Sequence, residues 1–213
     1  MVIDAGHDLR GNSETEPIGP GSSTRKIKDG GGTRGVVSGL TEAELNMRVA
    51  ARLRPLLERA GVRVVMTRTR TSGTSMGNVA RARIANRAGA GLFLRIHADG
   101  STDPSARGSH TLSPALRTGW TDDIYAQSKR AARIVQAELV RTLRFPDRGL
   151  QERSDFTGFN WADTPVILVE MGFMTNRTDD RLLATAAYQR RAAVGLCRGA
   201  LRFIGRSTAP CAP

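Results

Sequence analysis

Four short apolar runs recur along the chain, each bounded by polar or turn-forming residues. They cover residues 2–5, 62–67, 92–97 and 166–170. Apolar runs of this length, without alternating polar positions, are typical of strands buried on both faces of a parallel sheet. We therefore expect these runs to form the centre of a sheet, with residues 108–112 as a candidate edge strand.

Helical patterns separate the apolar runs. The first begins at Thr41, which as N-cap forms a capping box with Glu44. It ends at Gly61, although Pro55 should kink it. Strands that alternate with helices predict an α/β fold, with a mostly parallel, twisted central sheet of about six strands flanked by helices on both faces. The other predicted helices cover residues 78–88, 122–144 and 188–203, with a short one over 179–184.

One domain is expected, because 213 residues with 39% hydrophobic content can bury a single substantial core. We place this domain at residues 1–205 and a C-terminal tail at 206–213. Within the domain, residues 8–40 are rich in glycine, lack apolar periodicity and far exceed the usual connection of about 4–6 residues. Such long segments are usually lids or disordered, so we expect a mobile flap beside the functional site.

Cys197 and Cys211 are too few for a disulfide framework, and their spacing does not suit a metal or redox motif. Cys197 falls in the last predicted helix and Cys211 in the proline-flanked tail. In an oxidising compartment a bridge between them would pin the tail to the helix. The alternative is a buried thiol and a disordered end, and the sequence leaves both open.

The formal net charge is +12, from 32 Lys and Arg residues against 20 Asp and Glu residues. Such a charge favours polyanionic partners, either nucleic acid or an anionic cell wall, although arginine-rich helices are commonly only solvated faces. We expect no nucleic-acid partner, because two Tyr, two Trp and six Phe residues form no recognisable stacking motif. We also expect no membrane span, since no apolar stretch approaches about 20 residues.

Two of the three histidines, His7 and His97, end predicted parallel strands, and Glu170 ends a third. Ligands of open α/β sheets bind beyond the carboxyl ends of the strands, where side chains from different strands meet. Any one of these residues alone could be a hydrogen-bonded structural group. Together with Glu42, in the first turn of the first predicted helix, they indicate a functional site.

Two histidines and one glutamate are a known ligand set for catalytic zinc, which keeps a fourth position open. Glu42 is our third candidate ligand beside His7 and His97, because a carboxylate is favoured at a helix start. The neighbouring Glu44 is already used in the capping box. Glu170 would then activate the attacking water as general base and acid, since it terminates an apolar strand, where desolvation raises its pKa.

Five short motifs follow one another along the chain, in an order and spacing that resemble the catalytic domain of zinc-dependent N-acetylmuramoyl-L-alanine amidases. The resemblance spans residues 1 to about 204. It implies that His7, Glu42 and His97 bind Zn²⁺ and that Glu170 is the catalytic acid and base. The motifs are Asp4-Ala5-Gly6-His7, Glu42-Ala43-Glu44-Leu45-Asn46, Arg81 with Ile84-Ala85-Asn86, Ile96-His97-Ala98, and Val169-Glu170-Met171-Gly172-Phe173 ending in Asn176.

The resemblance also implies the substrate. This is the peptidoglycan amide that joins the lactyl group of N-acetylmuramic acid to L-alanine of the stem peptide, so the implied partners are peptidoglycan or muropeptide fragments. Because peptidoglycan lies outside the cytoplasmic membrane, we expect an exported protein of the periplasm or cell wall. A strand that begins at residue 2 leaves no signal peptide in this chain, so we expect that an upstream segment was removed. We expect a monomer.

The chain departs from the family pattern beside the motifs. Asp8 and Leu9 stand where the family usually has two glycines, and Arg95 stands where a small residue is common. Asp99 replaces a frequent asparagine. These departures bear on substrate contacts more than on zinc binding.

Three further polar residues lie near the motifs. Asn46 and Asp99 are candidates for orienting a metal ligand, with an exposed loop residue as the alternative for Asp99. His110, on the candidate edge strand, either faces the cleft or is a surface or core residue. The sequence favours the second interpretation of His110, because lone histidines are more often structural.

Two other functions stay open at this point. A different zinc peptidase acting on stem peptides would share the metal chemistry. A non-catalytic wall-binding protein would normally have lost a ligand or the base, whereas all four candidate groups are present here.

Overall fold

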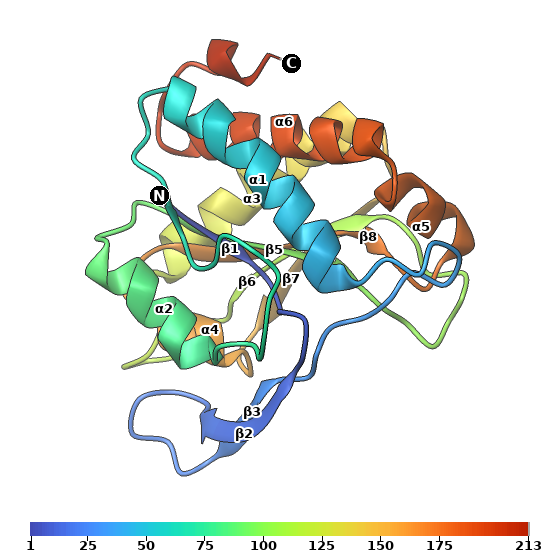
Figure 1. Ribbon diagram of the computed structural model, residues 1–213. Coiled ribbons are helices and arrows are strands. Elements are labelled where there is room, and N and C mark those ends of the chain that lie inside the picture. The colour runs from blue at the N-terminus through green and yellow to red at the C-terminus, as the bar shows by residue number, and fades with distance from the viewer. Residues whose placement is uncertain (213) are drawn as a thin grey trace.

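A six-stranded sheet forms the centre of the computed structural model, which describes residues 1–212 (Figure 1). Its strand order is β4-β1-β5-β8-β6-β7. Four strands run parallel, while β6 is antiparallel to β8 and β7 is parallel to β6. The predicted α/β fold with a mostly parallel sheet is confirmed. The strands are β1 (Val2–Ala5), β4 (Val65–Met66), β5 (Phe93–Asp99), β6 (Ser109–Pro114), β7 (Asp147–Arg153) and β8 (Val166–Phe173).

Helices cover both faces of the sheet, as predicted. α1, α3 and α6 pack together on one face, and α2 and α4 lie on the other (Figure 1). α5 connects β8 to α6. The helices are α1 (Glu42–Arg59), α2 (Asn78–Arg87), α3 (Tyr125–Leu143), α4 (Thr157–Asn160), α5 (Arg177–Leu183) and α6 (Ala186–Phe203).

The central strands are apolar throughout because each contributes to two cores. Successive side chains of a strand point to opposite faces. Leu94 and Ile167 therefore pack into the larger core with α1, α3 and α6. Their neighbours Phe93 and Val166 pack into the smaller core beneath α2 and α4. This double burial explains the uninterrupted apolar runs in the sequence.

The start of α1 is fixed by the predicted capping box. The Thr41 hydroxyl accepts a hydrogen bond from the Glu44 backbone N–H at 3.3 Å, and the Glu44 carboxylate accepts one from the Thr41 N–H at 3.2 Å. Pro55 does not end the helix, which continues to Arg59. Because Glu44 is committed to the cap, Glu42 is left as the first helical residue with its side chain free to face the sheet.

The glycine-rich segment 8–40 is not a structureless loop. It contains an antiparallel hairpin of β2 (Asn12–Pro17) and β3 (Arg25–Asp29), which projects beyond the sheet (Figure 1). Most of its side chains are polar, and all of its strand residues except Glu16 are exposed or only partly buried, so it lacks the apolar alternation that would reveal strands in the sequence. The hairpin lies beside the candidate site, as the flap interpretation required, while its mobility stays a prediction.

Other differences concern edges and ends. β7 and α4 were not predicted, because β7 is an exposed, charged edge strand and α4 is a single turn. The run at 62–67 forms only a two-residue strand, Val65–Met66. α3 begins at Tyr125 rather than at residue 122, and α6 begins earlier than predicted, at Ala186. No helix within residues 1–212 combines the length and apolar composition needed to cross a membrane.

A disulfide joins Cys197 to Cys211, with the two Cα atoms 5.8 Å apart. It holds a short 3-10 helix, η1 (Ala209–Cys211), against α1 and α6. Of the two alternatives left open by the sequence, the bridged tail is therefore the one observed. Residue 213 of the predicted tail lies outside the described residues.

Removing this bridge is expected to destabilise the protein. A cross-link between residues 14 apart limits the unfolded chain, and the double variant Cys197→Ala/Cys211→Ala should lose about 2–3 kcal/mol of unfolding free energy. Urea denaturation measures the loss. Reductant should lower the stability of the wild type to a similar extent and leave the variant unchanged. Equal stability of oxidised wild type and variant would contradict the expectation.

Candidate active site

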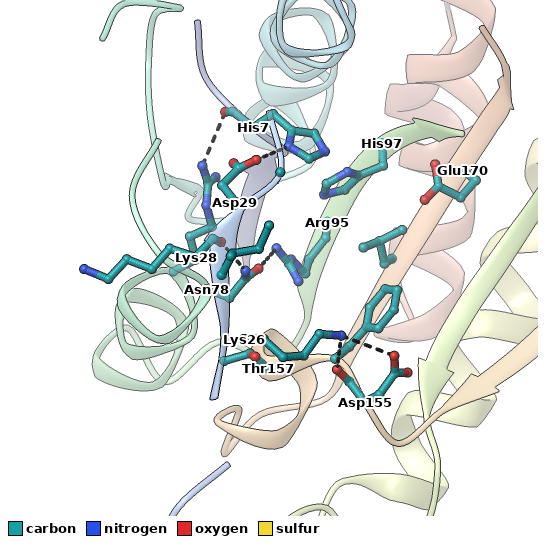
Figure 2. A pocket seen from close by; sticks show the side chains of 16 residues that line it. His7, Lys26, Lys28, Asp29, Asn78, Arg95, His97, Asp155, Thr157 and Glu170 are labelled. Carbon is teal, nitrogen blue, oxygen red and sulfur yellow. Dashed lines mark hydrogen bonds and ion pairs between the residues drawn. The ribbon is translucent and has the colours of Figure 1, made fainter. Parts of the chain in front are cut away.

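Four candidate residues from distant segments meet at the carboxyl edge of the sheet. His7 follows β1, His97 lies in β5, Glu170 lies in β8, and Glu42 begins α1. His97 and Glu170 are paired residues of adjacent strands. Figure 2 shows the side chains of His7, His97 and Glu170 converging on the same space. The sequence prediction that these residues share one site agrees with this arrangement.

The tightest part of this group is formed by the two histidines and Glu42. Glu42 Oε1 lies 3.2 Å from His7 Nε2 and 2.9 Å from His97 Nδ1. One nitrogen or oxygen from each of the three side chains lies within 4.8 Å of the others. His97 and Glu42 are buried, and His7 is partly buried. Three donors of the type that zinc prefers therefore face one point.

The backbone around His7 is built to bring the two rings together. His7 has a positive φ of 58°, an unusual conformation for a residue with a side chain. The preceding Gly6 leaves room for the His97 ring, since a Cβ at this position would lie 2.2 Å from the His97 Nε2 atom. In this compact turn, Gly6 makes space for the ring of His97 next to that of His7.

Two residues outside the predicted zinc-binding set orient its members. Asp29 Oδ1 lies 2.6 Å from His7 Nδ1, which directs Nε2 of the same ring toward Glu42. Asn46 donates from Nδ2 to Glu42 Oε1 and to the Gly6 carbonyl, both at 3.3 Å. The proposed role of Asn46 agrees with these contacts. Asp29 was missed, because nothing in the sequence shows that β3 returns to the end of β1.

Asp99 and His110 occupy a different place. Asp99 Oδ2 lies 3.5 Å from His110 Nε2, and Asp99 makes no hydrogen bond or ion pair with His7, Glu42 or His97 within residues 1–212. These contacts do not support a direct role for Asp99 in orienting a zinc ligand, and its role as an orienting residue stays a prediction. His110 is buried on β6 and stacks against Phe173, in agreement with the core interpretation of this residue.

The charges in the cluster stabilise an ionised Glu42. Burial disfavours its charged form, but His7 and His97 outweigh burial and hold the pKa of Glu42 well below its usual range. For His7, burial is likewise outweighed by Glu42 and Asp29, which raise its pKa to about 10. Burial lowers the pKa of His97. Glu42 is thus a buried carboxylate that is stabilised by positive charge beside it, which His7 supplies here. A metal ion bound between the three side chains would supply the same kind of charge.

Glu170 has the opposite electrostatic character. Burial, followed by the negative charges of Glu42 and Asp99, raises its pKa well above the usual value. Its Oε2 atom is buried and has no hydrogen-bond partner in the part of the chain that the structure describes. A carboxyl group with a raised pKa and an oxygen without a hydrogen-bond partner in the described chain therefore stands beside the cluster of His7, Glu42 and His97.

Comparison with known proteins agrees with this geometry. Residues 1–202 match the family model described as N-acetylmuramoyl-L-alanine amidase. The chain belongs to this amidase family. The predicted family, the hydrolase class and the amidase reaction on peptidoglycan are thereby confirmed.

Individual amidases are also similar to this chain in sequence and in structure. The chain is 30% identical to an N-acetylmuramoyl-L-alanine amidase of Mycobacterium tuberculosis, over 96% of this chain and 86% of the relative. It is 32% identical to the amidase LytC of Bacillus subtilis, over 78% of this chain but only 32% of LytC, so it corresponds to about a third of that protein. The crystal structure of an N-acetylmuramyl-L-alanine amidase of Mycobacterium smegmatis superposes with a TM-score of 0.86, at 28% identity, and covers 96% of this chain and 95% of that one.

A buried ion network holds the turn of the amidase that carries His7. The Asp4 carboxylate, fully buried in β1, pairs with Arg81 and Arg95 and accepts a hydrogen bond from the Thr67 hydroxyl at 2.6 Å. Arg81 also donates to the His7 carbonyl at 3.3 Å. Burial raises the pKa of Asp4, but the two guanidinium groups outweigh it and hold the pKa well below the usual range. Asp4 and Arg81, noted only as parts of motifs, thus position the backbone at His7.

Two cavities of the amidase meet at the candidate centre. One, of about 270 Å³, lies between β3, α4 and the sheet, and the other, of about 480 Å³, lies beside the loop after β5. His7, His97 and Glu170 line both. The first is also lined by Lys26, Asp29, Asn78, Arg95, Asp155 and Thr157, and the second by Thr33, Glu42, Asp99, Ser101, Thr102 and Thr175. An extended substrate can therefore pass through the centre with one part in each cavity.

Proposed function

We propose that His7, Glu42 and His97 hold a zinc ion and that Glu170 is the general base and acid in hydrolysis of the N-acetylmuramoyl-L-alanine amide. The proposal is carried by the convergence of the three donors from three separate elements, all within 4.8 Å, with Glu170 beside them. Two histidines and one glutamate form a catalytic zinc set with an open fourth position.

Each protein group has a role that follows from its contacts. When bound, zinc supplies a positive charge that polarises the scissile carbonyl and acidifies water. Glu42 supplies negative charge, and Asp29 keeps the His7 proton on Nδ1 so that Nε2 can act as a ligand. Glu170 takes a proton from the attacking water and returns it to the leaving nitrogen of L-alanine. Its raised pKa favours the first of these transfers, because a carboxylate with a higher pKa is a stronger base.

Digestion of purified muropeptides tests this function. The amidase should release an intact stem peptide from the sugar, with activity lost in a chelator and restored by added zinc. Products cut within the stem peptide would instead identify a zinc peptidase of that peptide. Binding to peptidoglycan without any cleavage would identify a wall-binding protein.

The support of His7 by Asp29 gives a separate prediction. Removing a carboxylate that orients a metal-bound histidine typically costs about 10–100-fold in metal affinity. Asp29→Ala should therefore weaken zinc binding by this amount in a competition titration with a chelating dye. Glu14→Ala, on the other strand of the same hairpin and 74% exposed, is the matched control and should bind zinc like the wild type. Unchanged affinity in Asp29→Ala would show that Asp29 does not support a ligand.

We further propose that the amidase acts as a monomer outside the cytoplasmic membrane, in the periplasm or cell wall. Peptidoglycan lies there, and the Cys197–Cys211 disulfide suits an oxidising compartment. Sedimentation measures the oligomeric state, and fractionation of the producing cells measures the location.

A further inference from the structure

The two cavities that meet at the candidate centre differ in charge. Glu42 and Asp99 line only the larger one, which no lysine or arginine lines within residues 1–212, whereas Glu170 lines both. Apart from His7 and His97, the other polar side chains of the larger cavity carry hydroxyls of threonine and serine. The smaller cavity, between β3 and the sheet, is lined by Lys26, Lys28, Arg81 and Arg95. Figure 2 shows Lys26, Lys28 and Arg95 among its side chains. We call it the basic cavity.

The cations of the basic cavity are not neutralised by the acids around them. Asp4 is a single carboxylate that pairs with both Arg81 and Arg95. Asp155 is likewise a single carboxylate, paired with Arg153 at 2.8 Å and with Lys26 at 3.3 Å. Asp4 with its two arginines, and Asp155 with Arg153 and Lys26, therefore each retain one positive charge in excess. Apart from Asp155 and Glu170, the only acid that lines the cavity within residues 1–212 is Asp29, which is paired with His7.

These cations also keep hydrogen-bond donors for a ligand. Arg95 uses Nε on Asp4 and Nη2 on the Asn78 side chain, whereas its Nη1 has no hydrogen-bond partner within the described chain. This atom lies over Gly158, where a Cβ would come within 2.4 Å of it. Lys26 Nζ donates twice, to the carbonyl and carboxylate of Asp155, and can donate once more.

We propose that the basic cavity binds a free carboxylate of the stem peptide, so that the peptide lies on the side of the β2–β3 hairpin and the sugar lies in the hydroxyl-lined cavity. This inference rests on the proposed function, because it assigns the two halves of the amidase substrate to the two cavities. An acidic peptide is attracted by Lys26 and Arg95, whereas the other cavity offers it no lysine or arginine from residues 1–212. A sugar carries hydroxyls, which Thr33, Ser101 and Thr102 can hydrogen-bond.

Lys26→Gln tests the assignment with two matched substrates. These are muramoyl peptides in which the carboxylate of the residue after L-alanine is either free or converted to an amide. The wild type should have the higher kcat/KM for the free acid. Lys26 is 42% exposed, so its removal should lower kcat/KM for the free acid by about three- to fivefold, and leave that for the amide unchanged.

Lys28→Gln is the matched control. Lys28 lies on the same strand and also lines the cavity, but its Nζ pairs with Glu14 at 2.6 Å and, in Figure 2, points away from Lys26 and Arg95. It should retain the preference of the wild type. Arg95→Gln is a second test and should lower the preference about tenfold, because a buried charged donor is lost. Thermal unfolding of this variant shows whether the protein remains folded.

The outcomes separate this inference from the proposed function. Cleavage of both substrates with equal kcat/KM by the wild type, or an unchanged preference in folded Lys26→Gln and Arg95→Gln, would overturn the assignment of the peptide to the basic cavity and leave the amidase activity standing. Failure of the wild type to cleave either substrate would overturn the proposed function, and this inference with it.

Discussion

Glu170→Gln is expected to lower kcat for muropeptide cleavage by about 10²–10⁴-fold, the usual contribution of general acid-base catalysis, while zinc content stays at that of the wild type. Glutamine has the size of glutamate and can remain in β8, but it cannot take a proton from water and return it to the leaving nitrogen. The measurements are steady-state kinetics on a purified muropeptide and metal analysis of the same sample.

His97→Ala is the comparison that gives this result its meaning. His97 Nδ1 lies 2.9 Å from Glu42 in the candidate centre, so its removal should lower both zinc content and turnover. Loss of zinc in Glu170→Gln would place Glu170 among the ligands instead. Turnover near the wild-type value in Glu170→Gln would exclude it as the base.

Asp4→Asn is expected to cost about 3–5 kcal/mol of unfolding free energy, because it leaves the buried guanidinium groups of Arg81 and Arg95 without a charged partner. Urea denaturation measures this loss. The control is Glu58→Gln, which removes the exposed pair with Arg54 within α1 and should cost no more than about 0.5 kcal/mol. A loss below about 1 kcal/mol in Asp4→Asn would mean that the network is not a stabilising element.

The same pairing predicts a dependence on pH. The pKa of Asp4 is lowered in the folded protein, below its unfolded value of about 3.9. Its contribution to stability is therefore present above that pH and is lost as the pH falls below it. The stability difference between wild type and Asp4→Asn should accordingly shrink when both are unfolded in urea at progressively lower pH.

Much of the fold was predictable because the central strands and the main helices bury enough apolar surface to leave a pattern. Phe93 and Leu94 serve different cores, and this requirement appears directly as an apolar run. β7 and the β2–β3 hairpin bury little, so their charged residues give no such pattern. Their pairing depends on tertiary contacts that a local sequence window does not contain.

The candidate site divides in the same way. His7, His97 and Glu170 could be predicted because strand ends in a parallel sheet meet at one edge. Glu42 followed from the cap of α1. Asp29 could not be predicted, since its contact with His7 depends on the path of the hairpin. The role of Asp4 also stayed hidden, because a buried carboxylate in an apolar run gives no indication of the two arginines that pair with it.

The wide separation of His7, Glu42 and His97 along the chain has a thermodynamic consequence. Since no single segment carries the three donors, the proposed zinc site is complete only in the folded sheet with α1 docked on it. Zinc at 100 times its dissociation constant would then add about 2.7 kcal/mol to the folded state. The metal supply of the compartment would thereby set how long the protein survives there, as well as how fast it works.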